Sequence, residues 1–201
     1  MSEIKEVLNL CLQDRDELYD REARRLYLNS EVDETIIDNL VYSILRWNRE
    51  DKGIPTKERE PIILYINTLG GSVSDGFSLI DFILESKTPV YTVNQGVCYS
   101  MGFLIFLSGD KRYSMNNSTF LMHDGSSMAF GSVSKVKDRV EFETGQMEEH
   151  IKDYVLSRTS ISDELYQEQY RKEWYMYSNE AKKYGITTHI VGVDCDIDEI
   201  L

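Results

Sequence analysis

The sequence has few of the features that mark secreted, membrane-spanning or nucleic-acid-binding proteins. Its 201 residues include only three cysteines, which form no Cys-x-x-Cys pair, so we expect reduced thiols and a cytoplasmic location. No apolar run approaches the ~18 residues that span a bilayer, and the first residues lack the pattern of a signal peptide. Basic residues are scarce, since 22 Lys and Arg stand against 35 Asp and Glu, a net charge of −13. Because no apolar run is long enough, we expect no membrane anchor. Because the charge is strongly acidic, we expect no nucleic-acid partner.

The middle of the sequence alternates between apolar runs of strand length and helical patterns. The continuous run 62–67 predicts a strand covered on both faces, and it leads through Gly70 and Gly71 into helical spacing over 73–83. Three further elements are predicted in order: a strand at 90–93, a buried helix at 100–109 and a strand at 119–123. This alternation predicts right-handed βαβ units around a largely parallel sheet, so the fold class is α/β.

Flanking segments add shorter elements and one long helix. We predict an amphipathic helix at 3–18, a strand at 25–29, a helix capped by Asp33, a surface loop at 51–61, a helix near 162–171, a strand at 174–177, a helix at 179–184 and a last strand at 189–193. From Val133 to Tyr154 an apolar stripe follows helical spacing over about 25 residues, longer than a small core needs. Either this helix packs on the sheet, or it projects and buries its stripe against another subunit.

Three places combine a turn or strand end with a reactive or anion-binding group. Gly70 and Gly71 let the backbone approach a ligand and leave amide N–H groups free for an anionic oxygen, although this motif taken alone favours a plain strand-to-helix turn. Ser100 stands where a strand gives way to a helix, as an N-cap or as a nucleophile near the positive helix end. His123 closes an apolar strand at the sheet edge where α/β proteins place ligands, or it is structural. Together these groups supply a nucleophile, a base and backbone donors.

The chain resembles the proteolytic subunits of Clp proteases, the ClpP family of serine peptidases, in four motifs and in their order. The motifs are Leu64–Asn67 with Gly70–Val73, then Tyr99–Gly102, then Met122-His123, and finally Glu180–Gly185. The resemblance spans about residues 25–193. It implies a crotonase-like α/β fold of stacked ββα units with a protruding handle helix at about 132–158. Residues 1–24 are then a divergent N-terminal arm, and 25–201 form the peptidase domain.

The same resemblance implies a role for each site residue. Ser100 corresponds to the nucleophile, His123 to the general base, and the backbone N–H groups of Gly71 and Met101 to the oxyanion hole. Substrate would bind along Gly70, Ser72 and Val73. Glu173 stands where the family usually has the triad aspartate, and its extra methylene lengthens the reach by ~1.5 Å. The alternative for Glu173 is a surface ion pair with Arg171 or Lys172.

These assignments predict a serine endopeptidase subunit that cleaves unfolded proteins within a chambered homo-oligomer. The family implies stacked heptameric rings and an AAA+ Clp ATPase partner, and the chemistry requires no metal and no cofactor. Three alternatives stay open: a catalytically weak or inactive ring subunit, a stand-alone peptidase without an ATPase, and an acyl-CoA enzyme of the crotonase type. An acidic chain is a poor match for the phosphates of CoA.

Overall fold

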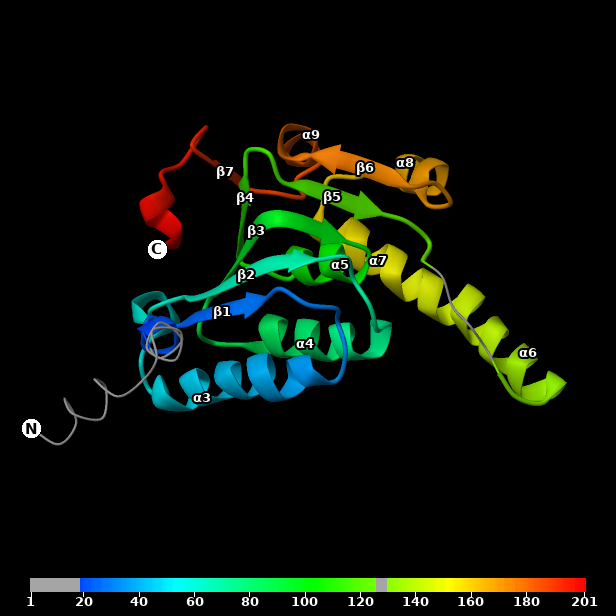
Figure 1. Cartoon of the computed structure of the whole chain (residues 1–201), viewed down its shortest axis with the longest axis horizontal. Coiled ribbons are helices and arrows are strands. Elements are labelled where there is room, and N and C mark those ends of the chain that lie inside the picture. Colours follow the sequence, from blue (N-terminus) through cyan, green and yellow to red (C-terminus); the bar gives the residue numbers. More distant parts are fainter. Residues whose placement is uncertain (1–18, 126–129) are drawn as a thin grey trace, which may run out of the picture.

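A seven-stranded sheet runs through the structure, a computed structural model that describes residues 19–125 and 130–201 (Figure 1). Its strands are β1 (Arg25–Leu28), β2 (Ile62–Thr68), β3 (Val90–Tyr99), β4 (Lys111–Met115), β5 (Thr119–Met122), β6 (Trp174–Tyr177) and β7 (His189–Val191). Five strands lie in the order β1-β2-β3-β4-β7. The first part of β3 pairs with β4 and its last part pairs with β5, which in turn pairs with β6. All pairs are parallel except β5–β6. The α/β fold class and the largely parallel sheet are confirmed.

Helices connect these strands and cover the sheet. They are η1 (Ile37–Val41), α3 (Tyr42–Glu50), η2 (Thr56–Glu58), α4 (Val73–Glu85), α5 (Met101–Leu107), α6 (Val133–Phe142), η3 (Glu143–Met147), α7 (Glu148–Arg158), α8 (Asp163–Gln169), α9 (Ser178–Lys183) and η4 (Ile197–Ile200). Every residue of α5 is buried, as the apolar segment predicts. The predicted helix at 3–18, and with it most of the arm at 1–24, lies outside the described residues.

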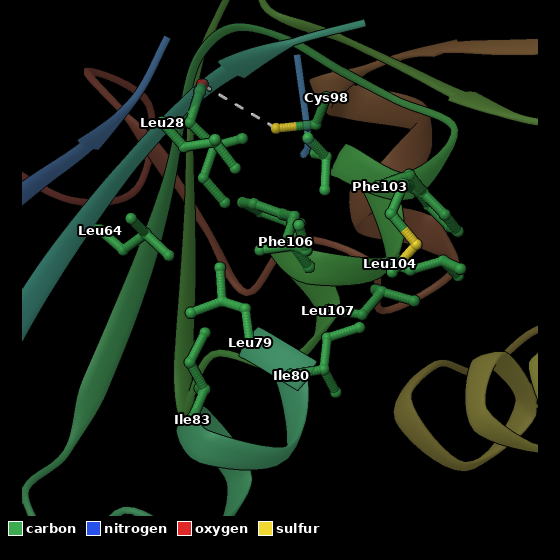
Figure 2. Packing of buried hydrophobic residues seen from close by; sticks show 14 of the residues in the cluster. Leu28, Leu64, Leu79, Ile80, Ile83, Cys98, Phe103, Leu104, Phe106 and Leu107 are labelled. Atoms are coloured by element: carbon green, nitrogen blue, oxygen red, sulfur yellow. Dashed lines mark hydrogen bonds between the residues drawn. The ribbon is translucent and has the colours of Figure 1, made fainter. Parts of the chain in front are cut away.

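Strand β2 is buried on both faces, which explains its unbroken apolar sequence. Ile62, Leu64 and Ile66 join the main core against α4 and α5, part of which Figure 2 shows. Ile63 and Tyr65 point to the opposite face, where a second cluster forms with side chains of β3, β4 and β7. The last residues cover this second cluster, since Ile200 is buried in it and its carbonyl accepts a hydrogen bond from the Tyr65 hydroxyl.

Strand β4 was not among the predicted strands, because its sequence KRYSM shows neither an apolar run nor a clear alternation. Its Arg112 is buried and its guanidinium donates to the carbonyls of Ile186 (2.7 Å) and Gly185 (2.8 Å). Burial lowers the pKa of Arg112 to about 10. These acceptors lie more than seventy residues away in the sequence, so local patterns carry no sign of them.

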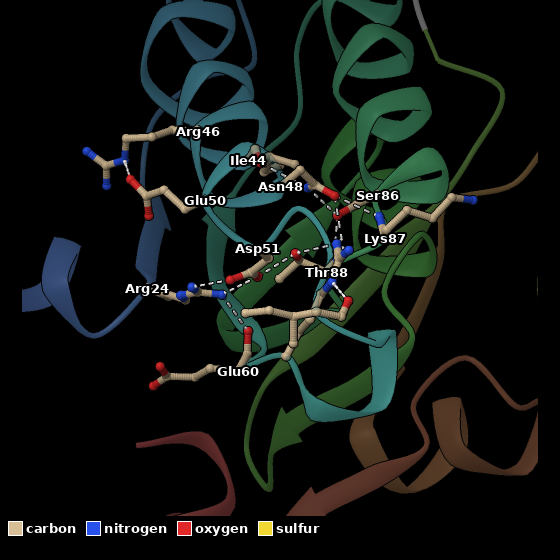
Figure 3. A network of polar contacts seen from close by, with 12 residues as sticks. Arg24, Ile44, Arg46, Asn48, Glu50, Asp51, Glu60, Ser86, Lys87 and Thr88 are labelled. Atoms are coloured by element: carbon tan, nitrogen blue, oxygen red, sulfur yellow. Dashed lines mark hydrogen bonds and ion pairs between the residues drawn. The ribbon is translucent and has the colours of Figure 1, made fainter.

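The predicted surface loop at 51–61 is correct except at its first residue. Asp51 is buried, and both of its carboxylate oxygens accept hydrogen bonds of 2.7 Å from the guanidinium of Arg24 (Figure 3). The Thr88 hydroxyl donates a third bond of 2.7 Å. Arg24 is the main cause that holds the pKa of Asp51 below its usual value. This network joins the start of β1 to the end of α3 and the turn before β3.

The long helix predicted from the apolar stripe is confirmed, and its two halves are placed differently. Segments α6, η3 and α7 follow one another without a break from Val133 to Arg158. The α7 end packs on the core, where Val155 is fully buried and the Tyr154 hydroxyl donates to the Leu104 carbonyl. The α6 end projects from the body in Figure 1, and Val133 and Phe142 are 88% and 52% exposed. We call residues 133–158 the handle.

Candidate active site

Ser100 occupies a strained turn between β3 and α5. Its backbone has φ 53° and ψ −121°, a conformation that a non-glycine residue adopts only where the surrounding structure enforces it. The Ser100 N–H donates to the Leu121 carbonyl (3.0 Å), which fixes the turn to β5. Ser100 stands at the N-cap position of α5, but its hydroxyl makes no capping hydrogen bond. The hydroxyl is therefore free for another role at the positive end of the helix.

The glycine loop packs directly against this turn. A Cβ atom on Gly70 would lie 2.8 Å from the Ser100 Cβ and 2.9 Å from the Tyr99 carbonyl oxygen, closer than real contacts allow. Gly70 and Gly71 also have φ values of 107° and 146°, which other residues rarely adopt. The close approach of loop and turn therefore requires glycine at 70.

Two backbone N–H groups near Ser100 are not used by the secondary structure. The Val32 N–H donates to the Gly70 carbonyl (2.8 Å), and the Val32 carbonyl accepts from the Ser72 N–H (2.7 Å). The Gly71 N–H takes no part in this bridge. Met101 is the first residue of α5, and its N–H has no acceptor within the helix. Ser72 caps α4 by accepting from the Asp75 N–H, so the loop is held at both ends.

Ser100 and His123 line the same pocket. Its volume is about 60 Å³, and Val73, Met101 and His123 border it together with Ser100 and with apolar side chains of α5, α7 and α8. His123 follows directly after β5, which pairs with β3 just before Ser100. A larger hollow of about 360 Å³ lies between the handle and α8 and contains none of the predicted site residues.

Glu173 holds the imidazole of His123. The His123 Nδ1 donates to the Glu173 Oε1 at 2.9 Å, across the antiparallel pair β5–β6. Lys172 forms an ion pair with Glu168 instead, so the structure does not place Glu173 in the alternative pair with that lysine. The other carboxylate oxygen accepts from the Tyr175 hydroxyl at 3.4 Å. Sequence reasoning missed Tyr175, although strand alternation puts residues 173 and 175 on one side.

The structure does not join Ser100 to His123 by a hydrogen bond. The His123 Nε2 is buried and has no hydrogen-bond partner among the described residues. In enzymes without substrate, the hydrogen bond between nucleophile and base is often long or misaligned and shortens when substrate binds. The arrangement thus brings the Ser100 hydroxyl, the carboxylate-bound imidazole of His123 and the start of α5 at Met101 to one pocket. Gly71 is not among the residues that line this pocket; it lies on the glycine loop that packs against the Ser100 turn through Gly70. Together these groups are the parts needed to attack a carbonyl carbon and stabilise the oxyanion that results.

Cys98 is not a competing nucleophile, although it lies two residues before Ser100. Its side chain is fully buried in the main core, visible in Figure 2, and burial raises the pKa of its thiol well above the ordinary value. Burial also raises the pKa of Tyr170, which lines the pocket, to about 12. Cys98 therefore acts as a small core residue.

Within residues 19–125 and 130–201, no three His, Cys, Asp or Glu side chains are grouped to hold a metal ion. None of the helices in this part of the chain combines the length and apolar composition that crossing a bilayer needs.

Known proteins are similar to this chain in sequence over most of its length. The family model described as Clp protease matches residues 12–194. The chain is 32% identical over 184 residues to ATP-dependent Clp protease proteolytic subunit 1 of Frankia casuarinae, covering 84% of this chain and 76% of that protein. It is 30% identical over 173 residues to subunit 3 of Synechococcus sp. strain CC9605, with 84% and 82% coverage. Subunit 2 of Corynebacterium diphtheriae is 28% identical over 181 residues, with 88% and 87% coverage.

The parallel sheet, the strained serine turn and the carboxylate-bound histidine are features expected of a serine peptidase with an α/β fold. With the family match over most of its length, the chain belongs to the Clp protease family and is a Clp-type serine peptidase. The match begins inside residues 1–24, and the boundary between arm and peptidase domain stays a prediction.

Proposed function

We propose that Ser100, His123 and Glu173 form the triad that hydrolyses peptide bonds in this protein. The Ser100 Oγ attacks the scissile carbonyl carbon while the His123 Nε2 takes its proton. His123 then returns that proton to the leaving amine, which leaves an acyl-enzyme on Ser100. A water molecule attacks the acyl carbon while His123 takes its proton, and His123 then gives the proton to the departing Ser100 Oγ. Glu173 holds the imidazole through Nδ1 and stabilises the positive charge that develops on it.

We further propose that the Gly71 and Met101 N–H groups bind the oxyanion of the tetrahedral intermediate. Their freedom from the Val32 bridge and from the helix supports this role. Gly70, Ser72 and Val73 form the edge along which an extended substrate binds by backbone hydrogen bonds, with little preference for sequence. No cofactor or metal takes part in these steps.

One observation carries the proposal: the 2.9 Å hydrogen bond from His123 Nδ1 to Glu173 Oε1 at the pocket that Ser100 lines. The test is to compare purified protein with its Ser100→Ala variant on a short fluorogenic peptide. We expect at least a 1,000-fold loss in kcat, since the nucleophile is removed. The matched control is Ser134→Ala, an exposed serine on the handle, which should keep full activity. A Ser100→Ala protein that cleaves as fast as the parent would refute the proposal.

A catalytically weak ring subunit is the second candidate function, because the His123 Nε2 has no hydrogen-bond partner within residues 19–125 and 130–201. Covalent labelling with a fluorophosphonate separates the two candidates. An aligned triad reacts at Ser100, and the modified peptide is identified by mass spectrometry. If Ser100 stays unlabelled while the protein is folded, the weak-subunit alternative is correct.

We also propose that residues 25–201 assemble, through the handle, into a chambered homo-oligomer of stacked heptameric rings in the cytoplasm. The exposed apolar side chains Val133, Val140 and Phe142 on the projecting half of the handle support an oligomeric contact there. Unfolded protein is the proposed substrate, delivered by an AAA+ Clp ATPase, since the relatives are named ATP-dependent. Sedimentation measures the assembly, and degradation of a folded protein with and without ATPase and ATP tests the partner. A monomer that degrades unfolded protein unaided would contradict this assembly.

A further inference from the structure

The carboxylate of Glu173 is held by two groups, one at each oxygen. Oε1 accepts from His123 Nδ1 at 2.9 Å, and Oε2 accepts from the Tyr175 hydroxyl at 3.4 Å. The Glu173 side chain is 58% exposed, so packing contributes little to fixing its conformation. Hydrogen bonds at both oxygens are therefore the main restraint on where this carboxylate points.

Tyr175 is itself fixed by the strands that carry the site. In the sheet, Tyr175 pairs with Leu121 of β5, and Leu121 pairs with Tyr99 of β3. The Tyr175 ring meets the Tyr99 ring edge to face, with centroids 5.6 Å apart and planes at 79°. The Tyr99 hydroxyl in turn lies 2.9 Å from the Thr119 hydroxyl. This row of side chains connects the Glu173 carboxylate to the residue directly before Ser100.

We propose that Tyr175 is a positioning residue of the peptidase, whose hydroxyl holds Glu173 in the conformation that orients His123. This inference rests on the proposed triad. A glutamate has one more rotatable bond than the aspartate usual in the family, and a second hydrogen bond offsets the freedom that this bond adds. Partial desolvation, together with the negative charge of Glu173, raises the pKa of Tyr175, so its hydroxyl stays protonated and able to donate.

The first test replaces the hydroxyl alone, with Tyr175→Phe, and uses Tyr177→Phe as the matched control. Tyr177 is an exposed tyrosine on the same strand, so the control removes the same atom from the same element. For Tyr175→Phe we expect about a fivefold lower kcat on a short peptide, an unchanged KM, and an acidic limb of the kcat/KM profile shifted to lower pH. Equal kcat and an unshifted profile, or the same loss in Tyr177→Phe, would overturn the inference.

The second test is a double-mutant cycle with Glu173→Asp. An aspartate at 173 is too short to hold His123 and Tyr175 together, so the tyrosine hydroxyl should have no partner left. We therefore expect Tyr175→Phe to cause no further loss in the Glu173→Asp protein. A fivefold loss in both backgrounds would show that Tyr175 acts independently of Glu173, which contradicts the inference.

The proposed triad and the proposed role of Tyr175 are refuted by different results. If Ser100→Ala or Glu173→Gln keeps full activity, the proposed triad is wrong and this inference falls with it. If those variants lose activity while Tyr175→Phe equals the parent, the triad stands and only the role of Tyr175 is refuted. Thermal unfolding of each variant, compared with the parent, verifies that the measured losses come from folded protein.

Discussion

The two ends of the candidate site are built in different ways. At the Ser100 end, the backbone and the core set the geometry: Ser100 is strained, Gly70 touches it, and all of α5 is buried. At the Glu173 end, a long and mostly exposed side chain is set by two hydrogen bonds. The nucleophile end should therefore tolerate almost no change, whereas the carboxylate end should respond in steps to changes in side-chain length and bonding.

Gly70→Ala tests the rigid end and has the largest expected effect. The new methyl would lie 2.8 Å from the Ser100 Cβ at a φ of 107°, so the loop or the serine turn must move. We expect about a 1,000-fold loss in kcat, because a displacement near 1 Å can cost about 100-fold and both the loop and the serine turn carry groups proposed to act in the reaction. Peptide hydrolysis measures this loss.

The control for this change is Gly145→Ala in the handle. Nothing lies within 4 Å of a Cβ at Gly145, and the residue is helical. Activity should be unchanged, with stability higher by up to about 1 kcal/mol. A Gly70→Ala protein as active as Gly145→Ala would contradict the rigidity of the serine end.

Glu173→Gln tests the adjustable end with the next largest effect. The amide keeps the size but removes the negative charge that stabilises the histidine when it gains a proton. We expect about a 100-fold loss in kcat with KM nearly unchanged. A Glu173→Gln protein with parental kcat would exclude Glu173 from the triad and leave His123 without its orienting group.

Glu173→Asp keeps the charge and should have a smaller effect. Because the shorter side chain cannot span the same distance, the bond to His123 lengthens and kcat falls about tenfold. Steady-state kinetics measures this step between the parent and Glu173→Gln. A loss as large as that of Glu173→Gln would mean that both ends of the site are equally rigid.

Asp51→Asn should lower the stability of the protein and leave its activity unchanged. It leaves the half-buried Arg24 guanidinium without its charged partner, at an expected cost of about 3 kcal/mol in the free energy of unfolding. The folded-state pKa of Asp51 is lowered, so its contribution is present above the unfolded pKa of about 4 and is lost as pH falls through the folded value. Urea unfolding of parent and variant from neutral to acid pH measures this difference, which should shrink in acid.

The sequence predicted the elements whose evidence is local. Strand β2, helix α4 and the handle all follow from apolar spacing, and the buried α5 follows from a continuous apolar segment. The resemblance to the family named Glu173, and the structure places its carboxylate beside His123. The catalytic roles of Glu173 and His123 stay a prediction.

What the sequence did not predict depends on distant partners. Arg112 is buried because carbonyls more than seventy residues away accept its hydrogen bonds, and Asp51 is buried because Arg24 pairs with it across 27 residues. Charged residues of this kind look like surface positions until the fold supplies their partners. Tyr175 was missed for the same reason, since its packing against Tyr99 requires the pairing of β3, β5 and β6.

The most direct measurement of the central claim is a crystal structure of the protein after reaction with a fluorophosphonate. We predict a phosphorus–oxygen bond to Ser100 Oγ, a phosphonyl oxygen within ~3 Å of the Gly71 and Met101 amides, and His123 Nε2 turned toward the adduct. An adduct on another residue, or a phosphonyl oxygen that points away from both amides, would contradict this prediction.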